Sequence, residues 1–429
     1  MTVGPVGAII ATMNASFPVD RVRERFPGLA REVGGQPAVF LDGPAGSQVP
    51  QSVIDAVGRC MADINANAGG VFATSVETDQ MLSDAGQAMA DLLGAGSADE
   101  VVFGANMTTL TFMLASAMSK TWSAGDRIIL TRLDHDANVS PWELAARDVG
   151  AEVFHVGVSP DDGSLDLEQL KGALSDRTRL VAVPAASNLI GTVQPIRDIV
   201  QWSHAAGAQV FVDAVHYAPH RLMDVADWGC DFLCCSAYKF FGPHVGVLWA
   251  RGELLDALPA RKLRVAPDYL PERWLLGTQN HEGIAGAAAA VEYLADLGRE
   301  VTGDRGLQRR AALRAAFEAI ERHEGALAAR FLEGLGELPG LRVWGLADPS
   351  RVAERAPTIA ITHEHHRPAD ICRRLAEQGV FAWSGNNYAL PLTEALGLEP
   401  DGVVRLGLLH YNSLAEVERV VEMLRRDLS

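Results

Sequence analysis

The sequence predicts an α/β protein in which helices cover a mostly parallel β-sheet and a smaller α+β domain follows. Short, continuously apolar segments alternate with segments of helical periodicity between residues 101 and 214. A parallel sheet has this pattern because its strands are buried on both faces. After residue 280 the pattern changes to long helical segments and then to three more strand candidates. A chain of 429 residues is also long for a single core, so we expect two structural units.

The elements follow from local periodicity and from turn and cap residues. Before residue 100 we expect a helical arm at 20–35, a short strand within VFLDG (39–43), and helices at 52–65 and 83–93. The alternating region predicts strands at 101–103, 127–131, 151–156, 179–183 and 209–214, with helices at 108–118, 140–150, 167–174 and 196–206. The C-terminal region predicts helices at 283–298, 306–335 and 368–378 and strands at 341–345, 358–362 and 403–409.

Composition and charge limit the classes of function. We divide the chain into an N-terminal arm associated with the small domain (1–35), a large domain (36–300) and a small C-terminal domain (301–429). The net charge of −17 argues against a general binder of nucleic acid or of anionic membranes. No apolar run approaches the roughly 20 residues of a membrane span. The N-terminus lacks the basic region of a signal peptide, and the five cysteines do not suggest a disulfide framework. We therefore expect a cytoplasmic protein without nucleic-acid or membrane partners.

The segment 209–249 places charged side chains at the ends of apolar strands. Lys239 follows one such strand, and Asp213 ends another one about 26 residues earlier. Charges in these places are costly unless they are used, and Lys and Asp with a nearby hydroxyl, here Ser236, are the parts that bind pyridoxal 5′-phosphate (PLP). We expect Lys239 to form the Schiff base and Asp213 to pair with the protonated pyridine nitrogen. The alternatives are a loop lysine and a buried aspartate that caps a helix.

Other candidate site residues lie where strands end or helices begin. Met107 and Thr108 open a helix after a strand, so their amides and the Thr108 hydroxyl suit a phosphate group. His135 follows the strand at 127–131, where it can stack on the cofactor ring or move protons, or can simply be solvated.

No metal site is predicted. The CDFLCC segment (230–235) fits a buried strand, and its adjacent cysteines, Cys234 and Cys235, should point to opposite faces. The THEHH segment (362–366) lacks the spacing of a zinc motif and fits a polar loop.

Six segments together resemble the class V aminotransferase family of fold type I PLP enzymes, and within it the cysteine desulfurase and selenocysteine lyase branch. They are DHDANVSPW (134–142), SNLIGT (187–192), VDAVH (212–216), CSAYKFFGPHVGVLW (235–249), GTQN (277–280) and RLGLLHYN (405–412). NANAGG (65–70) and GANMT (104–108) resemble the cysteine desulfurase-like subgroup. The resemblance implies the fold of a fold type I PLP-dependent transferase, with PLP bound by the large domain.

The resemblance also assigns roles to residues of this chain. It matches the cofactor contacts to Lys239, Asp213, His135, Asn188, Ser236 and Thr108. Arg405 matches the arginine that binds the substrate carboxylate, and Asn188 lies beside the substrate as well as the cofactor. Thr278 matches a phosphate ligand that reaches in from a second subunit, which implies a homodimer with shared active sites.

Three positions depart from the pattern of the branch. Desulfurases carry a mobile cysteine that forms a persulfide, but the matching segment 381–389 has none, and Tyr388 lies near its place. His216 replaces a frequent Gln and is expected to bind the phenolic oxygen of the cofactor. Tyr238 replaces a His beside the lysine, which leaves one phosphate or proton contact open.

These residues predict a PLP-dependent enzyme that acts on a small amino substrate through an external aldimine and an α-carbanion. β-Elimination of the C–S lyase type is favoured, because the branch does related chemistry and Tyr388 can protonate the leaving group. A class V aminotransferase, an epimerase and a PLP-fold protein without catalytic activity are the alternatives.

Overall fold

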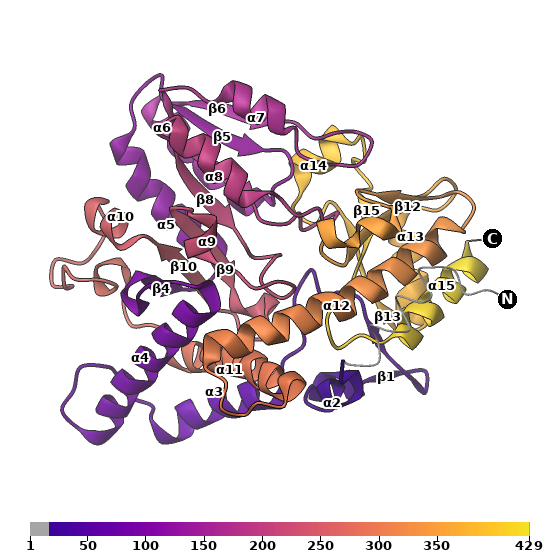
Figure 1. Ribbon diagram of the computed structural model, residues 1–429, viewed down its shortest axis with the longest axis horizontal. Coiled ribbons are helices and arrows are strands. Elements are labelled where there is room, and N and C mark those ends of the chain that lie inside the picture. The colour runs from indigo at the N-terminus through magenta and orange to yellow at the C-terminus, as the bar shows by residue number, and fades with distance from the viewer. Residues whose placement is uncertain (1–16, 429) are drawn as a thin grey trace.

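The computed structural model describes residues 17–428, which form one seven-stranded and one four-stranded sheet, both flanked by helices (Figure 1). The strands of the larger sheet are β4 (Val101–Gly104), β5 (Arg127–Thr131), β6 (Glu152–Val156), β7 (Thr178–Pro184), β8 (Gln209–Asp213), β9 (Phe232–Ser236) and β10 (Gly246–Ala250). Their spatial order is β4-β10-β9-β8-β7-β5-β6. Strand β10 is antiparallel to β4 and β9, and the other pairs are parallel. The expected mostly parallel sheet is confirmed.

Alternate residues of each strand pack into two different cores, because successive side chains point to opposite faces. Cys234 belongs to the core that α5 (Met107–Met118) and α6 (Ser140–Val149) cover. Cys235 belongs to the core that α8 (Ile196–Ala205) and α11 (His281–Thr302) cover. The opposite orientation expected for these two cysteines is therefore confirmed.

The carboxyl ends of four neighbouring strands meet at one edge of the larger sheet. They are those of β5, β7, β8 and β9, which are adjacent and parallel. Ligands of open α/β sheets bind beyond such an edge. The loops that leave these four strands carry His135, Asn188, His216 and Lys239, so the sheet topology gathers these candidates at one place.

The second sheet is antiparallel, in the order β11 (Leu341–Trp344), β12 (Thr358–His363), β15 (Val403–Gly407) and β14 (Trp383–Gly385). It packs with α12 (Arg309–Gly336), α13 (Pro368–Glu377) and α15 (Leu414–Asp427) around a core of its own. Figure 1 shows α12 running from beside α11 to this second unit. Strand β3 (Val39–Phe40) pairs with β13 (Val380–Phe381), and Asp42 forms a bridge to Gly407 of β15, so the chain before the first sheet contacts the second one. The domain limits at residues 35 and 300 stay a prediction.

Two expected elements differ from the observed ones. The helical arm at 20–35 is only α2 (Val19–Arg23) and a 3₁₀-helix at Pro27–Ala30, followed by a short hairpin of β1 (Glu32–Val33) and β2 (Gln36–Pro37). Helix α4 (Ala73–Leu93) begins ten residues before the expected position 83. Its first turns bury Ser75 and Thr78, whose hydroxyls donate to the carbonyls of Asn67 and Ile64. Polar packing of this kind leaves no hydrophobic period in the sequence.

Several smaller elements complete the fold. Helix α3 (Gln51–Asp63) precedes α4, α7 (Leu167–Ala173) and α9 (Val225–Trp228) connect strands of the larger sheet, and α10 (Gly252–Ala257) follows its last strand. Strand β14 and helix α14 (Leu390–Ala395) were not expected from the sequence. Between residues 17 and 428 no helix is both long and apolar enough to span a membrane.

Candidate active site

Lys239 and Asp213 reach one buried cavity from adjacent strands. Asp213 is the last residue of β8, and Lys239 ends the 3₁₀-helix η5 (Ala237–Lys239), which directly follows β9. Both side chains are buried and line the same cavity. The Lys239 ammonium nitrogen Nζ donates a hydrogen bond to the carbonyl oxygen of Pro44. The structure therefore brings together the amine and the carboxylate that the sequence singles out.

The environment of Lys239 favours the neutral amine. Its pKa is lowered to about 7, first by burial and then by the nearby Arg405 cation, while Asp213 acts in the opposite direction. Near neutral pH a large fraction of Lys239 is therefore unprotonated, which is the form that attacks a carbonyl group or accepts a proton.

The environment of the Asp213 carboxyl group favours a cationic partner. Burial raises the pKa of its carboxyl group to about 6, and the Val215 amide, which donates to Oδ1 at 2.9 Å, and the Lys239 charge oppose this effect. A cation brought next to a buried carboxylate lowers its pKa again and compensates its desolvation. The protonated nitrogen of a pyridine ring is such a cation.

The N-terminus of α5 also lines the cavity. Asn106 caps this helix, because its Oδ1 accepts a hydrogen bond from the Thr109 amide at 2.9 Å. The Met107 amide donates to the Ser236 hydroxyl oxygen at 3.0 Å, which joins the helix start to the end of β9. Asn106, Met107, Thr108 and Ser236 all line the cavity. A helix N-terminus with hydroxyl groups beside it suits a phosphate group.

His135 lines the same cavity. Its Nδ1 accepts a hydrogen bond from the Ala137 amide at 3.0 Å, and its ring stacks on the Tyr388 ring with centroids 5.3 Å apart. Burial, and then the Lys239 and Arg405 charges, lower the pKa of His135 to about 4, so its imidazole is neutral at physiological pH. A neutral ring that lines the cavity is suited to pack against an aromatic cofactor.

Tyr388 is held in an uncommon backbone conformation. Asn387 and Tyr388 have φ values of 52° and 61°, in the left-handed region that costs non-glycine residues about 1–3 kcal/mol. The Asp136 amide donates to the Tyr388 carbonyl at 2.7 Å, and the Asn188 side-chain amide donates to the Asn387 carbonyl at 2.9 Å. These bonds hold the segment over His135, although the Tyr388 side chain is 72% exposed.

A second cavity of about 490 Å³ adjoins the first one and shares His135, Asn188, Tyr238 and Lys239 with it. The segment 383–388 forms one wall, and Arg405 of β15 also lines it. Burial lowers the pKa of the Arg405 guanidinium to about 9, opposed by Tyr238 and Asp42. A buried guanidinium that reaches into a cavity fits a carboxylate ligand.

Three buried polar atoms around the two cavities lack a hydrogen-bond partner: His216 Nδ1, Asn188 Oδ1 and Arg405 Nε. These atoms are available to a ligand that enters the cavities. The cavity thus offers a lysine, a carboxylate, a neutral aromatic wall and a helix N-terminus, and these residues fit PLP. Arg405 also donates to the Asn188 carbonyl at 2.9 Å, which ties the two cavities together.

Thr278 is the one sequence candidate that the single chain does not bring to the site. It is exposed, in the segment between the 3₁₀-helix Glu272–Trp274 and α11, and it lines neither cavity. Its role in the site of a second subunit stays a prediction.

The sequence analysis missed residues that hold the side chains and loops of the site in place. Asp134 is fully buried and accepts hydrogen bonds from Thr131 and, at 2.7 Å, from Asn138, which fixes the loop that carries His135. Its place at the end of a strand was a usable signal. Thr358, which bonds His216 at 3.0 Å, and Pro44, which accepts from Lys239, lie far away in the chain, and no local pattern marks them.

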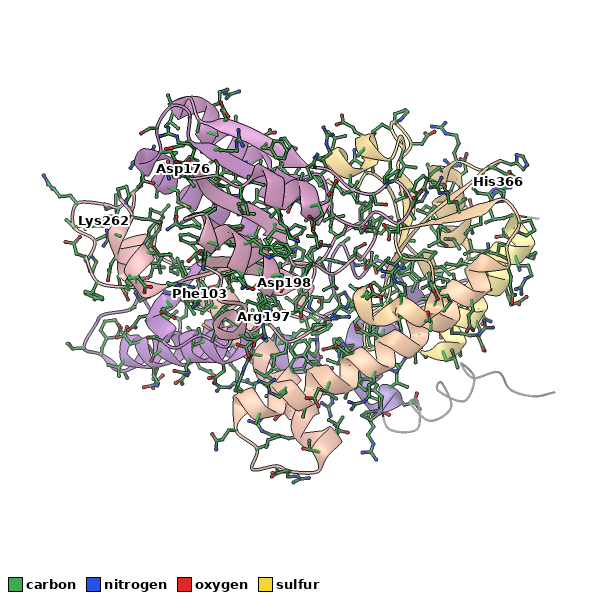
Figure 2. All side chains as sticks on the ribbon, turned by 45° about the horizontal axis from the view of Figure 1, so that its top comes forward. Phe103, Asp176, Arg197, Asp198, Lys262 and His366 are labelled. Carbon is green, nitrogen blue, oxygen red and sulfur yellow. The ribbon has the colours of Figure 1, made fainter. Side chains whose placement is uncertain are left out.

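No group of three or more His, Cys, Asp or Glu side chains suited to a metal ion occurs within residues 17–428. In the THEHH segment the rings of His363 and His366 lie 4.9 Å apart. His366 lies at the outer edge of the C-terminal part in the view of Figure 2.

Comparisons with known proteins agree with this geometry. The aminotransferase class-V family profile matches residues 39–420. Cysteine desulfurases of Pectobacterium atrosepticum and Serratia proteamaculans are 33% and 32% identical over 426 residues, which cover 96% of this chain and 98% of each relative.

Solved structures of cysteine desulfurases are similar to this chain over nearly its whole length. The apo enzyme of Thermococcus onnurineus has a TM-score of 0.85 at 27% identity, and an enzyme of Escherichia coli has a TM-score of 0.81 at 25% identity. Each comparison covers 96% of this chain and 98% of the other. This chain belongs to the class V aminotransferase family and is a fold type I, PLP-dependent enzyme.

Proposed function

We propose that this enzyme catalyses β-elimination on an amino acid, with cleavage of a carbon–sulfur bond and without an enzyme-bound persulfide. The observation that carries the proposal is the wall of the second cavity, which presents Tyr388 and no cysteine. All five cysteines lie within the described residues, and none lines either cavity. Four of them are buried, and Cys372, the partly exposed one, has its thiol pKa raised to about 11 by burial.

PLP supplies an acceptor for the electron pair that remains when the substrate α-carbon loses its proton. Lys239 would hold the cofactor covalently and Asp213 would pair with its pyridine nitrogen. His216 would contact its phenolic oxygen. The start of α5, with Thr108 and Ser236, would hold its phosphate.

The residues that line the second cavity have different roles in the reaction of the substrate. Arg405 binds the carboxylate, and Asn188 lies beside it. Lys239, whose amine is about half neutral near pH 7, takes the α-proton. The bond between the β-carbon and sulfur breaks, sulfur keeps the electron pair, and the Tyr388 hydroxyl protonates it. The three-carbon enamine that leaves the site hydrolyses in water to pyruvate and ammonia.

A homodimer with shared sites is part of the proposal. Two stretches of the surface expose large apolar side chains: Val71, Phe72 and Val76 near the start of α4, and Leu263, Val265, Tyr269 and Leu276 after α10. Exposed apolar patches of this kind indicate an interface. Thr278 lies directly after the second stretch, where a partner subunit would meet it. The unpaired state of all five cysteines supports a cytoplasmic location.

The experiment is an incubation of the purified holoenzyme with L-cysteine and with S-alkyl and S-aryl cysteines. We expect pyruvate and ammonia in equal amounts, together with the thiol. Alanine with sulfide or persulfide would contradict the proposal and indicate desulfuration. Conversion of the cofactor to its pyridoxamine form would indicate a transaminase, and loss of optical rotation without other products would indicate an epimerase.

Tyr388→Phe tests the proposed acid. The ring stack on His135 survives this change, but the hydroxyl is lost. We expect kcat for S-alkyl cysteines to fall about 100-fold, within the range of general acid catalysis, while KM stays within about threefold. S-aryl cysteines, whose thiolates leave without protonation, should lose much less. An equal loss for both substrates would rule out Tyr388 as the acid.

A further inference from the structure

His216 is anchored on one side and unpartnered on the other. Its ring is 3% exposed, and its Nε2 lies 3.0 Å from the Thr358 hydroxyl oxygen at the start of β12. Its other nitrogen, Nδ1, has no hydrogen-bond partner, although His216 lines the cavity that holds Lys239 and Asp213. A ligand that is bound in this cavity is therefore the natural partner of Nδ1.

The Thr358 hydroxyl decides which nitrogen carries the proton. Thr358 is completely buried, and His216 is the sole hydrogen-bond partner of its hydroxyl within the described chain. If Nε2 donated to this oxygen, the hydroxyl proton would be buried without an acceptor. A buried donor without a partner is rarer than an unused lone pair, so the hydroxyl donates to Nε2.

The imidazole has only one proton to place. Burial lowers the pKa of His216 well below its usual range, and the nearby Lys239 and Arg405 cations lower it further, so the ring is neutral. When Nε2 accepts from Thr358, the single proton is on Nδ1. Nδ1 is then a donor, and it belongs to a residue that lines the cofactor cavity.

A second layer keeps the ring in place. The His220 ring packs edge-to-face on His216, with centroids 5.4 Å apart, and its Nδ1 lies 2.8 Å from Glu324 of α12. His216 is thus held by two elements of the second unit, β12 and α12, and not only by its own loop.

We propose that Thr358 is a positioning residue that fixes His216 in the tautomer with the proton on Nδ1, so that this imidazole donates a hydrogen bond to the anionic phenolic oxygen of PLP. A donor at this oxygen stabilises the form of the lysine-bound cofactor that has lost its imine proton. The imine of the lysine-bound cofactor should therefore lose its proton at a lower pH than it would without Thr358. This inference rests on the cofactor and not on the elimination proposed above.

The first test follows the absorbance of the holoenzyme against pH, without substrate. Thr358→Val removes the hydroxyl at nearly constant shape, and we expect the midpoint of the spectral change to rise by about one pH unit. Thr358→Ser keeps a hydroxyl and should retain the wild-type midpoint. His216→Gln provides an amide donor that needs no tautomer, so Thr358→Val should have no further effect in that background.

Three outcomes would overturn the inference: an unchanged midpoint in Thr358→Val, an equal shift in Thr358→Ser, or the same shift in the His216→Gln background. The second test needs no variant of Thr358. ¹⁵N spectra of the cofactor-free protein, with His216 assigned by comparison with His216→Gln, should show the proton on Nδ1, and a proton on Nε2 would refute it. Both tests omit substrate, so their failure is distinct from a failure of the proposed reaction.

Discussion

Burial controls the protonation of individual residues in this site. Burial, with nearby cations, leaves His135 and His216 uncharged at physiological pH and brings Lys239 close to half-neutral near pH 7. Arg405 keeps its charge despite burial, because its lowered pKa of about 9 is still above physiological pH. The site therefore combines one permanent cation for a substrate carboxylate with one base, Lys239, that is ready to accept a proton.

Replacement of the lysine gives the most direct residue-scale prediction. Lys239→Ala removes the amine to which PLP is expected to bind, so the visible absorbance band of the lysine-bound cofactor should disappear. The exposed residue Lys120 provides a matched control, since Lys120→Ala should keep the band. An unchanged band in Lys239→Ala would contradict the assignment, provided that circular dichroism shows a folded protein.

Burial of Lys239 should also appear in the stability of the cofactor-free protein. The folded state releases its proton near pH 7, whereas the unfolded chain keeps it up to pH 10.5. Between these values the unfolded state binds more protons, so the Lys239 contribution to stability improves as pH rises. We expect Lys239→Met to be more stable than wild type at pH 6, and the gap to narrow by about 2 kcal/mol at pH 9. Urea unfolding at pH 6 and at pH 9 measures the gap.

At the scale of elements, the sequence predicts those strands and helices that have a regular hydrophobic pattern. The buried strands β5, β7, β8 and β9 are short apolar runs, and they bring Asp213 and Lys239 to one edge through topology alone. The start of α4 has no such period, because it packs through Ser75 and Thr78.

Contacts between distant segments are also invisible to periodicity. Thr358 lies 142 positions from His216, and Pro44 lies 195 positions from Lys239. Asp213 and Ser236 were predicted because they end apolar strands, where a polar side chain stands out, whereas Thr358 and Pro44 reach the site only through folding. The stack of Tyr388 on His135 similarly depends on two left-handed residues that no pattern announces.

The approach of β10 to the loop before α5 gives an element-scale prediction. A Cβ atom at Gly246 would lie 2.4 Å from the Asn106 carbonyl carbon, which is backbone and cannot move aside cheaply. Gly246→Ala should therefore lower the free energy of unfolding by about 1–3 kcal/mol and weaken PLP binding, because it displaces the helix start that suits the phosphate. Denaturation and cofactor titration measure both effects.

Gly58→Ala in α3 is the control. Nothing lies within 4 Å of the added Cβ atom, so this change should instead raise the free energy of unfolding by about 0.5–1 kcal/mol and leave PLP binding unchanged. A fully stable Gly246→Ala holoenzyme would show that the loop can shift.

At the scale of the whole molecule, the site of one chain has contributions from both units. Lys239 and Asp213 come from the larger sheet, whereas Arg405 and Thr358 come from the smaller one. The long helix α12 packs against α11 of the first unit and against β11 and α15 of the second. The position of the second unit therefore decides whether Arg405 lines the second cavity and whether Thr358 reaches His216. In the proposed dimer, the second chain would add Thr278.

Association of two chains is the prediction that belongs to this scale. The loop before α4 and the segment after α10 lie at the same end of the molecule in Figure 1, and Val71 and Val265 are 99% and 86% exposed there. Sedimentation velocity should show a dimer for wild type and a monomer for Val71→Asp, because a charge in an apolar interface is left without a partner. Leu144→Asp, on α6, is the control and should stay dimeric.

Thr278→Ala should also stay dimeric but bind PLP about tenfold more weakly, since it loses one hydrogen bond to a charged phosphate. A monomeric wild type would contradict the dimer, and unaltered PLP affinity in Thr278→Ala would contradict the shared site.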